Sequence, residues 1–305
     1  MPDPRSGPPR DFVGYGAHPP KVIWPDGSAV AVNLVLNYEE GAEYSLLDGD
    51  PFNDTWGETS STVPPEVRDM GTETHYEFGS RVGVWRIARI AEEFGVALSV
   101  DAPALALERN PQVAQWLREG PHDVIGHGYR WTEDSQMTRE EEREHLHHAI
   151  ESVKGTTGQR VRGWMVRTMP SVNTRELLVE EGGFLYDSDA SNDELPYFVD
   201  VKGTPFLVVP YSKVYNDVKY FLAPTYAKPS DFFESLRAGV EYMLGEAARG
   251  HGGRMISVGL HSRWSGQAHR ASAVRDFVEY VLGREGACFM RRLDIAQHWI
   301  DQFTP

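Results

Sequence analysis

The sequence predicts an α/β protein built on a mainly parallel sheet, either closed as a barrel or open and doubly wound. Two observations predict this fold class. From residue 28 onward, short apolar runs alternate with amphipathic segments, which is the order of repeated strand–helix units. The chain has 305 residues, and single α/β barrels routinely reach about 250 residues. We therefore expect one domain at residues 26–305 and an N-terminal arm at residues 1–25.

The elements follow from local patterns. Val30, Val32, Leu34 and Leu36 share one face of an alternating run, which predicts a strand ending at residues 37–38. A long irregular stretch at 41–74 follows, and connections of this length usually carry function. Further strands are expected at 96–100, 123–126, 162–166, 184–186, 206–211, 255–260 and Cys288. Helices are expected at 82–94, 111–120, 138–154, 173–181, 230–248, 271–282 and 293–303, the third opened by a capping box of Thr138 and Glu141.

Composition excludes several classes of protein. The formal net charge of -15 argues against binding to nucleic acid or to an anionic membrane. No apolar run is long enough to span a bilayer. The single cysteine, Cys288, excludes an internal disulfide and a cysteine-rich zinc site. The Pro- and Gly-rich residues 1–20 contain no apolar core of a signal peptide. We expect a cytoplasmic protein that acts on a small molecule.

Ionisable side chains follow six of the predicted strands. In parallel barrels the reactive groups lie just after the carboxyl ends of the strands. The residues at these positions are Glu39, Glu40, Asp101, His127, Arg167, Asp187, Asp189, His261 and Arg263. Packing alone does not explain this pattern, and it predicts an enzyme active site.

Glu39 and Glu40 are the central pair. Adjacent residues at a strand end point to opposite sides, so one can act on substrate while the other holds a neighbour or a metal. A pocket carboxylate with a raised pKa is a suitable general base for activating water. Arg81 lies near the expected start of a helix, where a cation opposes the helix dipole, so it is expected to bind an external anion; an ion pair with Glu77 is the alternative.

Three segments resemble the ordered motifs of the polysaccharide deacetylase (NodB-homology) superfamily. They are Asn-Tyr-Glu-Glu-Gly at 37–41, Ile-Gly-His-Gly-Tyr at 125–129 and Ser-Val-Gly-Leu-His at 257–261. The resemblance implies an irregular (β/α)7 barrel that hydrolyses C–N bonds. It implies that Glu39 is the base, that Glu40 and His127 stand at metal-binding positions, and that His261 is the general acid.

The sequence is most similar to one branch, the deacetylase-type allantoinases. Shared features include Tyr-Glu-Phe-Gly-Ser-Arg at 76–81, His-Gly-Tyr-Arg-Trp at 127–131, Asn-Asp at 216–217 and Gly-Leu-His-Ser-Arg at 259–263. Trp131 stands where the superfamily has its second zinc histidine, which implies catalysis without a tightly bound metal. Asp101 and residues 165–172 depart from the branch where substrate would lie.

We therefore predict hydrolysis of a non-peptide C–N bond in a small cyclic amide, imide or ureide, with no cofactor required. Glu39 would activate water and His261 would protonate the leaving nitrogen. Arg167 or Arg263 would bind an anionic group or the oxyanion. Other expected substrate contacts are Arg81, Tyr129, Trp131 and Asp101.

Two alternatives remain open. One is a metal-dependent deacetylase of N-acetylated sugars that holds zinc or another divalent cation on Glu40 and His127. The other is a catalytically silent binding protein on the same fold. The arm carries Phe12 and Tyr15 among several prolines, so we also expect a homo-oligomer, a dimer or a tetramer, with residues 10–20 at a subunit contact or across their own barrel.

Overall fold

Strands from the whole chain form one curved sheet in the computed structural model, which describes residues 7–56, 61–222 and 225–304. The strand order is β6 (Tyr197–Val201), β7 (Thr204–Val208), β5 (Tyr186–Asp187), β4 (Gly163–Trp164), β3 (Asp123–Gly126), β2 (Ser99–Ala102), β1 (Val30–Asn37) and β8 (Arg254–His261), and β9 (Ala287–Phe289) pairs with β1. All pairs are parallel except β6 with β7. The predicted parallel sheet is confirmed.

The sheet closes only in part. No strand pairing joins β7 to β8 within the described residues. Instead, the irregular segment after β7 runs beside β8, where Asn216 forms a parallel bridge with Gly259 and the Gly259 N–H donates to the Tyr215 carbonyl at 2.8 Å. The result is a half-barrel with surrounding helices, which is the irregular (β/α)7 barrel that the resemblance implies.

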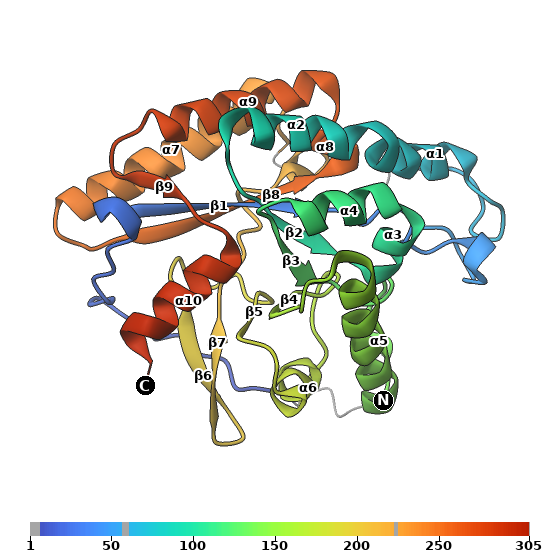
Figure 1. Cartoon of the computed structure of the whole chain (residues 1–305), viewed down its shortest axis with the longest axis horizontal. Coiled ribbons are helices and arrows are strands. Elements are labelled where there is room, and N and C mark those ends of the chain that lie inside the picture. Colours follow the sequence, from blue (N-terminus) through green and yellow to red (C-terminus); the bar gives the residue numbers. More distant parts are fainter. Residues whose placement is uncertain (1–6, 57–60, 223–224, 305) are drawn as a thin grey trace.

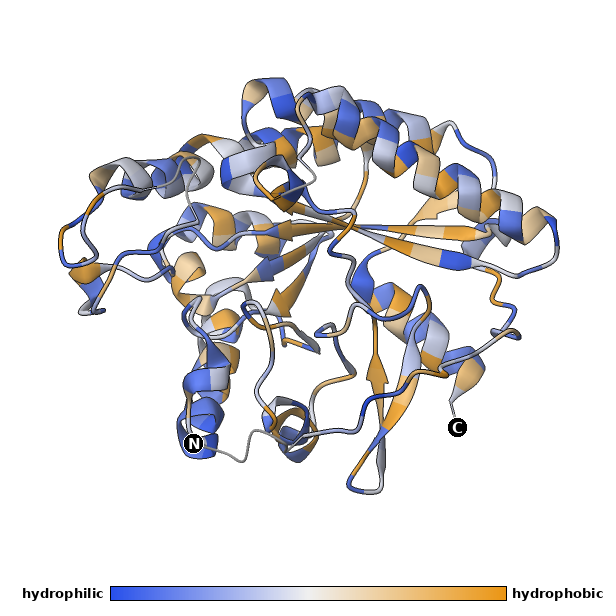
Figure 2. Cartoon of the chain, turned by 180° about the vertical axis from the view of Figure 1, so that it is seen from behind, coloured by the Kyte–Doolittle hydropathy of each residue, from blue (hydrophilic) through white to orange (hydrophobic). Residues whose placement is uncertain are grey.

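Helices surround this sheet (Figure 1). They are α1 (Met70–Phe78), a π-helical turn (Gly79–Gly83), α2 (Val84–Phe94), α3 (Ala104–Arg109), α4 (Pro111–Glu119), α5 (Arg139–Thr157), α6 (Thr174–Glu181), α7 (Pro229–Ala248), α8 (Ser262–Ser265), α9 (Ala268–Leu282) and α10 (Arg292–Phe303). The helices are apolar mainly toward the sheet and polar toward solvent (Figure 2). Among the described residues, no helix is long and apolar enough to cross a membrane.

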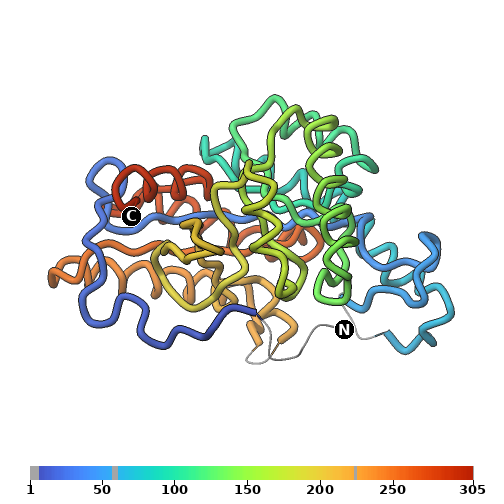
Figure 3. The backbone as a smooth tube through the Cα atoms, turned by 90° about the horizontal axis from the view of Figure 1, so that it is seen from below, coloured from blue at the N-terminus to red at the C-terminus, as the bar shows by residue number. Residues whose placement is uncertain are grey.

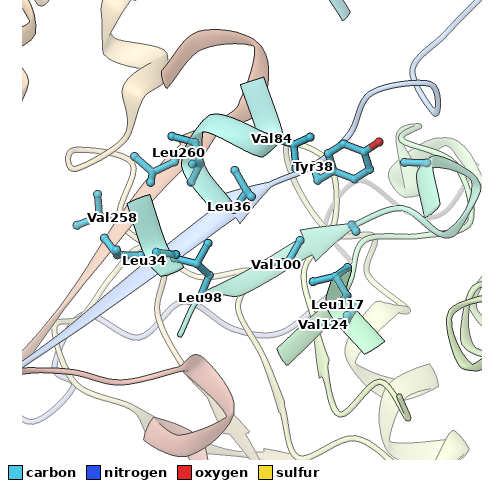
Figure 4. Packing of buried hydrophobic residues seen from close by; sticks show 14 of the residues in the cluster. Leu34, Leu36, Tyr38, Val84, Leu98, Val100, Leu117, Val124, Val258 and Leu260 are labelled. Atoms are coloured by element: carbon cyan, nitrogen blue, oxygen red, sulfur yellow. The ribbon is translucent and has the colours of Figure 1, made fainter. Parts of the chain in front are cut away.

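Strand β1 divides its side chains between two environments. Val30, Val32, Leu34 and Leu36 belong to the large apolar core. Figure 4 shows Leu34 and Leu36 within it. The alternate residues point into the barrel, where the Asn37 amide donates to the Tyr211 hydroxyl at 3.2 Å and to the Leu260 carbonyl at 3.1 Å. Every residue of β1 is buried, and this burial fixes the position of the residues that follow it.

Several element boundaries differ from the prediction. The helix expected at 82–94 begins earlier, because Asp69 caps α1 by accepting from the Thr72 N–H at 3.0 Å and the chain stays helical through the π-helical turn. Helix α3 and strand β6 were not predicted; β6 is half-buried and lacks a clear apolar face. The capping box of Thr138 and Glu141 is confirmed at the start of α5.

The N-terminal arm packs across its own domain. The Tyr15 hydroxyl donates to the Pro196 carbonyl at 2.6 Å, and its ring lies 6.3 Å from that of Trp299 in α10. Trp24 is fully buried beside α10, whereas Phe12 is 79% exposed. The arm runs along the outside of the domain toward the C-terminal helix (Figure 3). Residues 1–6 of the predicted arm lie outside the described residues, and self-association stays a prediction.

His122 gives the fold a pH dependence that can be measured. Burial, with the nearby Arg291 adding to it, lowers the pKa of His122 from 6.5 to about 4. Its Nδ1 accepts from the Leu98 N–H at 3.0 Å. Below pH 6.5 the unfolded chain binds a proton at His122 that the folded protein binds only near pH 4, so stability falls across this interval.

We expect the Tm of a His122→Asn variant to fall less between pH 7 and pH 4.5 than that of the parent protein. The asparagine Oδ1 can replace Nδ1 as the acceptor, and it does not titrate. Calorimetry of both proteins across this pH range measures the difference. Parallel curves of Tm against pH would contradict the effect assigned to His122.

Candidate active site

The carboxyl ends of β1, β3 and β8 bring Glu39, His127 and His261 together. Glu39 Oε1 lies 3.6 Å from His127 Nε2 and 3.6 Å from His261 Nε2. These distances exceed a normal hydrogen bond. All three residues are buried. The predicted convergence of these strand ends is therefore confirmed, with the free edge of one carboxylate facing two imidazoles.

Glu39 is held by Arg263. Its Oε2 accepts from Arg263 Nη1 at 2.7 Å, and the guanidinium is fully buried. Burial acts to raise the pKa of Glu39, but the positive charges of Arg263, His261 and His127 outweigh burial and lower that pKa below its usual range. The raised pKa expected of the base is therefore wrong for Glu39, which is ionised at neutral pH because three positive groups surround it.

His261 is oriented by Asp217, a fully buried residue of the irregular segment beside β8. Its Nδ1 lies 2.6 Å from Asp217 Oδ1, and its backbone N–H donates to Asp217 Oδ2 at 2.7 Å. Ser265 donates to the same carboxylate at 2.6 Å. Since Nδ1 donates to Asp217, Nε2 is the nitrogen that faces Glu39. Asp217 also supports the positive charge that His261 carries when Nε2 holds a proton.

His127 is oriented by the Met165 carbonyl, and the Asp101 carboxylate lies close to the same ring nitrogen. Its Nδ1 lies 2.7 Å from the Met165 carbonyl and 3.1 Å from Asp101 Oδ2. Burial acts to lower the pKa of His127, but Asp101 and Glu39 outweigh it and raise the pKa to about 9. Asp101 is fully buried behind this imidazole. We expected Asp101 to contact the substrate, but the structure places it against His127 and not on an exposed wall of the site.

Glu40 points away from the cluster toward the neighbouring helices. Its Oε2 accepts from the Ser262 hydroxyl at 2.7 Å and from the Glu39 N–H at 3.1 Å, and its Oε1 accepts from the Arg263 N–H at 3.1 Å. The π-helical turn passes so close that a Cβ at Gly79 would overlap this carboxylate. Glu40 therefore joins β1 to α8 and to the π-helical turn.

The metal site that the resemblance implies does not fit these residues. Both Glu40 oxygens already accept from protein donors, and Trp131 supplies no metal ligand where the superfamily has a histidine. Among the described residues, no group of three or more His, Cys, Asp or Glu side chains is arranged to hold a metal ion. The expectation that Glu40 and His127 share a cation is not met by this donor geometry.

Trp131 packs against both arginines of the site. The Cζ of Arg167 is 3.7 Å from the centre of the Trp131 ring, and the Cζ of Arg263 is 5.3 Å from it. Tyr76 of α1 packs against the same indole, with ring centres 6.5 Å apart. All four residues are buried. That Trp131, Arg167 and Arg263 contact the substrate stays a prediction.

Two predicted site residues lie elsewhere. The Arg81 side chain is 76% exposed and pairs with Glu77 at 3.5 Å, because the helix starts at Met70 and Arg81 is not in its first turn. Tyr129 follows Gly128, whose φ of 82° turns the chain away. The Tyr129 ring stacks on His148 of α5 at 3.6 Å. The structure does not bring Arg81 or Tyr129 to Glu39.

Two residues of the site were not assigned a role from the sequence. Asp217 lies in the Asn-Asp pair at 216–217 that resembles the deacetylase-type allantoinases, so this resemblance could have marked Asp217 as a site residue. Asp54 lies in the long loop after β1, where no periodic pattern marks a buried residue. It is 3% exposed and accepts from Arg167 Nη1 at 2.5 Å.

Known proteins of the same kind are found by both sequence and structure, although no protein-family model matches the chain. A Schizosaccharomyces pombe protein described as a polysaccharide deacetylase is 31% identical over 312 residues, covering 95% of this chain and 96% of the relative. The crystal structure of PuuE allantoinase has a TM-score of 0.92 at 39% identity, covering 97% of this chain and 99% of that chain. A Pseudomonas aeruginosa protein described as a polysaccharide deacetylase has a TM-score of 0.91 at 38% identity, with the same coverage.

The fold, the cluster at the strand ends and these relatives together define a hydrolase of carbon–nitrogen bonds other than peptide bonds. The chain belongs to the polysaccharide deacetylase (NodB-homology) family. Its similarity to PuuE allantoinase over almost the whole of both chains confirms the resemblance to the deacetylase-type allantoinase branch.

Proposed function

We propose that this hydrolase opens the ring of a small cyclic amide, imide or ureide, of which allantoin is the first candidate. The observation that carries the proposal is the ionised Glu39 carboxylate facing both histidines, with His261 backed by Asp217. The match to PuuE allantoinase supports a cyclic ureide. Asp101 and residues 165–172 depart from the allantoinase branch, so the substrate panel described below includes cyclic substrates other than allantoin.

The chemistry divides between Glu39 and His261. The oxygen of water bonds to the ring carbonyl carbon while one proton of the water passes to Glu39. The ring C–N bond then breaks as the proton on His261 Nε2 moves to the leaving nitrogen. The products are a carboxyl group and a free N–H at the two ends of the opened ring. Transfer of the proton from Glu39 to His261 restores the starting state.

Two buried N–H donors are suited to the developing oxyanion. Arg263 Nη2 and Trp131 Nε1 have no hydrogen-bond partner among the described residues, although both atoms are buried. Buried donors without a partner cost free energy, so they are usually explained by a ligand or a catalytic role. Losing one oxyanion donor typically raises a barrier by about 3 kcal/mol. Trp131 would then serve as a donor where the superfamily has a metal ligand.

The proposal requires no step through a metal, since both Glu40 oxygens already accept from protein donors. The alternative is deacetylation of N-acetylated sugars, and two of the relatives are described as polysaccharide deacetylases. The two functions differ in the bond that is cut, which is a ring amide in one and an exocyclic acetamide in the other.

A substrate panel separates them. Purified protein is incubated with allantoin, hydantoin, succinimide and oligomers of N-acetylglucosamine, and products are followed by proton NMR. We expect ring opening of at least one cyclic substrate and no release of acetate. Release of acetate without ring opening would replace the proposed function by the alternative.

A further inference from the structure

Arg167 is a buried cation whose charge is already balanced. Its side chain is 5% exposed, and Nη1 donates to Asp54 Oδ2 at 2.5 Å and to the Trp131 carbonyl at 3.0 Å. Its Nε lies 3.0 Å from Glu133 Oε1. An arginine that binds a substrate anion presents a fork of free N–H groups. In Arg167, Nη1 donates to the Asp54 carboxylate instead, and Nε lies beside the Glu133 carboxylate without a hydrogen bond to it.

Asp54 is held firmly in this position, although it belongs to an irregular loop. Its Oδ1 accepts from the Tyr76 hydroxyl at 2.8 Å and from the Trp56 N–H at 2.9 Å. Its side chain is only 1% exposed. Water therefore does not screen the pair of Asp54 and Arg167, and the carboxylate cancels much of the guanidinium charge.

The charge of Arg263, the second cation of the site, is also balanced by carboxylates, although its Nη2 has no hydrogen-bond partner among the described residues. It donates to Glu39 at 2.7 Å and lies 3.6 Å from Glu40, and it is fully buried. The contact of Arg263 Nε with the Trp56 carbonyl at 3.2 Å joins it to the same loop. A substrate anion entering this site would meet two arginines that are each already paired with carboxylates. The anion would therefore be buried as an unpaired charge, which is costly.

The surface next to Arg167 is acidic as well. A hollow of about 510 Å³ lies next to Arg167, because Tyr44 and Glu133 line the hollow and both contact Arg167. Its remaining lining residues include Glu141, Glu144, His145 and His148. Carboxylates that line a concave surface repel anions from it.

We propose that Asp54 is a specificity-determining residue that neutralises Arg167 and makes the site select uncharged substrates over anionic ones. This inference rests on the proposed function and narrows its substrate class to neutral rings. It replaces the expectation that Arg167 or Arg263 binds an anionic group of the substrate. Asp54 acts through Arg167 and is a positioning residue, not a catalytic one.

Matched pairs of ligands test this selection by binding alone. One pair is hydantoin-5-acetic acid and hydantoin-5-acetamide, which differ in one negative charge. The second pair is N-acetylmuramic acid and N-acetylglucosamine, which covers the alternative function. Affinities are measured by calorimetry for the full-length protein and for Asp54→Asn. The pair that binds reports the substrate class, and the ratio of acid to neutral affinity within that pair reports the role of Asp54.

We expect the parent protein to bind the neutral member more tightly. In Asp54→Asn the relative affinity for the acid is expected to rise at least threefold, and by about 10- to 100-fold if the guanidinium is fully released, the range for a hydrogen bond to a charged group. Glu133→Gln is expected to give a smaller rise, because Glu133 is 24% exposed and water already screens it.

Tyr76→Phe is the matched control for loosening of the loop. It removes the Tyr76 hydroxyl from Asp54 but keeps the Trp56 N–H and leaves the charge on Arg167 balanced, so the acid-to-neutral ratio is expected to stay within twofold of the parent value. A rise below threefold in Asp54→Asn, or an equal rise in Tyr76→Phe, would overturn the role of Asp54. If Asp54→Asn does not fold, tighter binding of the acid by the parent protein overturns the proposal by itself. Binding of neither pair would overturn both this proposal and the proposed function.

Discussion

Replacement of Glu39 by glutamine is expected to lower kcat by about 10²–10⁴-fold, the contribution typical of a positioned general base. The amide keeps the volume of the side chain and can still accept from Arg263, but it cannot take a proton from water. Steady-state kinetics on the best substrate of the panel measures the loss. The Tm is also expected to fall, because Arg263 would keep only Glu40, at 3.6 Å, and unpairing a buried ion costs about 3–5 kcal/mol.

Glu43→Gln is the control for this experiment. Glu43 lies four residues further along the same loop and accepts from the Gly41 N–H at 2.6 Å, without contact to either histidine of the cluster. Burial raises the pKa of Glu43 to about 7, so its neutral form is already populated at neutral pH. Its activity is expected to stay within a few-fold of the parent value. Full activity of a folded Glu39→Gln variant would remove Glu39 from the mechanism.

Replacement of Asp217 by asparagine is expected to lower kcat by up to about 10⁴-fold, the loss known for the aspartate of an Asp–His pair. Asp217 accepts from both the backbone N–H and Nδ1 of His261. An asparagine cannot stabilise a positive imidazole, and its NH₂ group can favour the tautomer with the proton on the wrong nitrogen. Kinetics of the single variants and of the double variant His261→Ala/Asp217→Asn measure whether the two residues act together.

The double variant is expected to be no slower than His261→Ala, since residues that act as one unit are strongly non-additive. Ser265→Ala is the matched control. It removes one donor to Asp217 Oδ2 but keeps the charge and both contacts to His261, so its loss is expected to be small. Independent, additive losses at His261 and Asp217 would show that Asp217 contributes only to folding.

The fold could be predicted well from the sequence where periodicity is strong. The alternation of β1 and the apolar run of β8 place Glu39 and His261 at neighbouring strand ends, and parallel strands present these ends at one edge. The irregular barrel was implied by the resemblance to the polysaccharide deacetylase superfamily. Geometry alone could not have distinguished this barrel from an open sheet, because its closure uses the irregular segment around Asn216.

Residues outside regular elements could not be predicted in the same way. Asp54 is buried by a loop that folds back on the site, and its partners Tyr76 and Arg167 lie 22 and 113 residues away in the sequence. Arg81 was placed in a first helical turn because the apolar periodicity starts near Val82, whereas the helix is extended back to Met70 by the Asp69 cap. Helix starts fixed by a single cap are weakly marked in sequence.

His145 illustrates a second limit. A helix dense in charged residues predicts a solvated face, yet His145 Nε2 accepts from the Tyr129 N–H at 3.1 Å and the Arg130 N–H at 3.0 Å. It thereby fixes the loop after β3 that carries Trp131. Such contacts depend on which loop covers a helix, which is a tertiary property absent from the local pattern.

Ring opening by metal-depleted protein is the most direct test of the central claim, that Glu39 and His261 hydrolyse a cyclic amide, imide or ureide without a metal. The protein is dialysed against a strong chelator, its metal content is verified by mass spectrometry, and kcat/KM for allantoin and for the best substrate of the panel is measured before and after addition of zinc. We predict that kcat/KM stays within about twofold throughout. Loss of ring opening on metal removal and its recovery with zinc would contradict the claim.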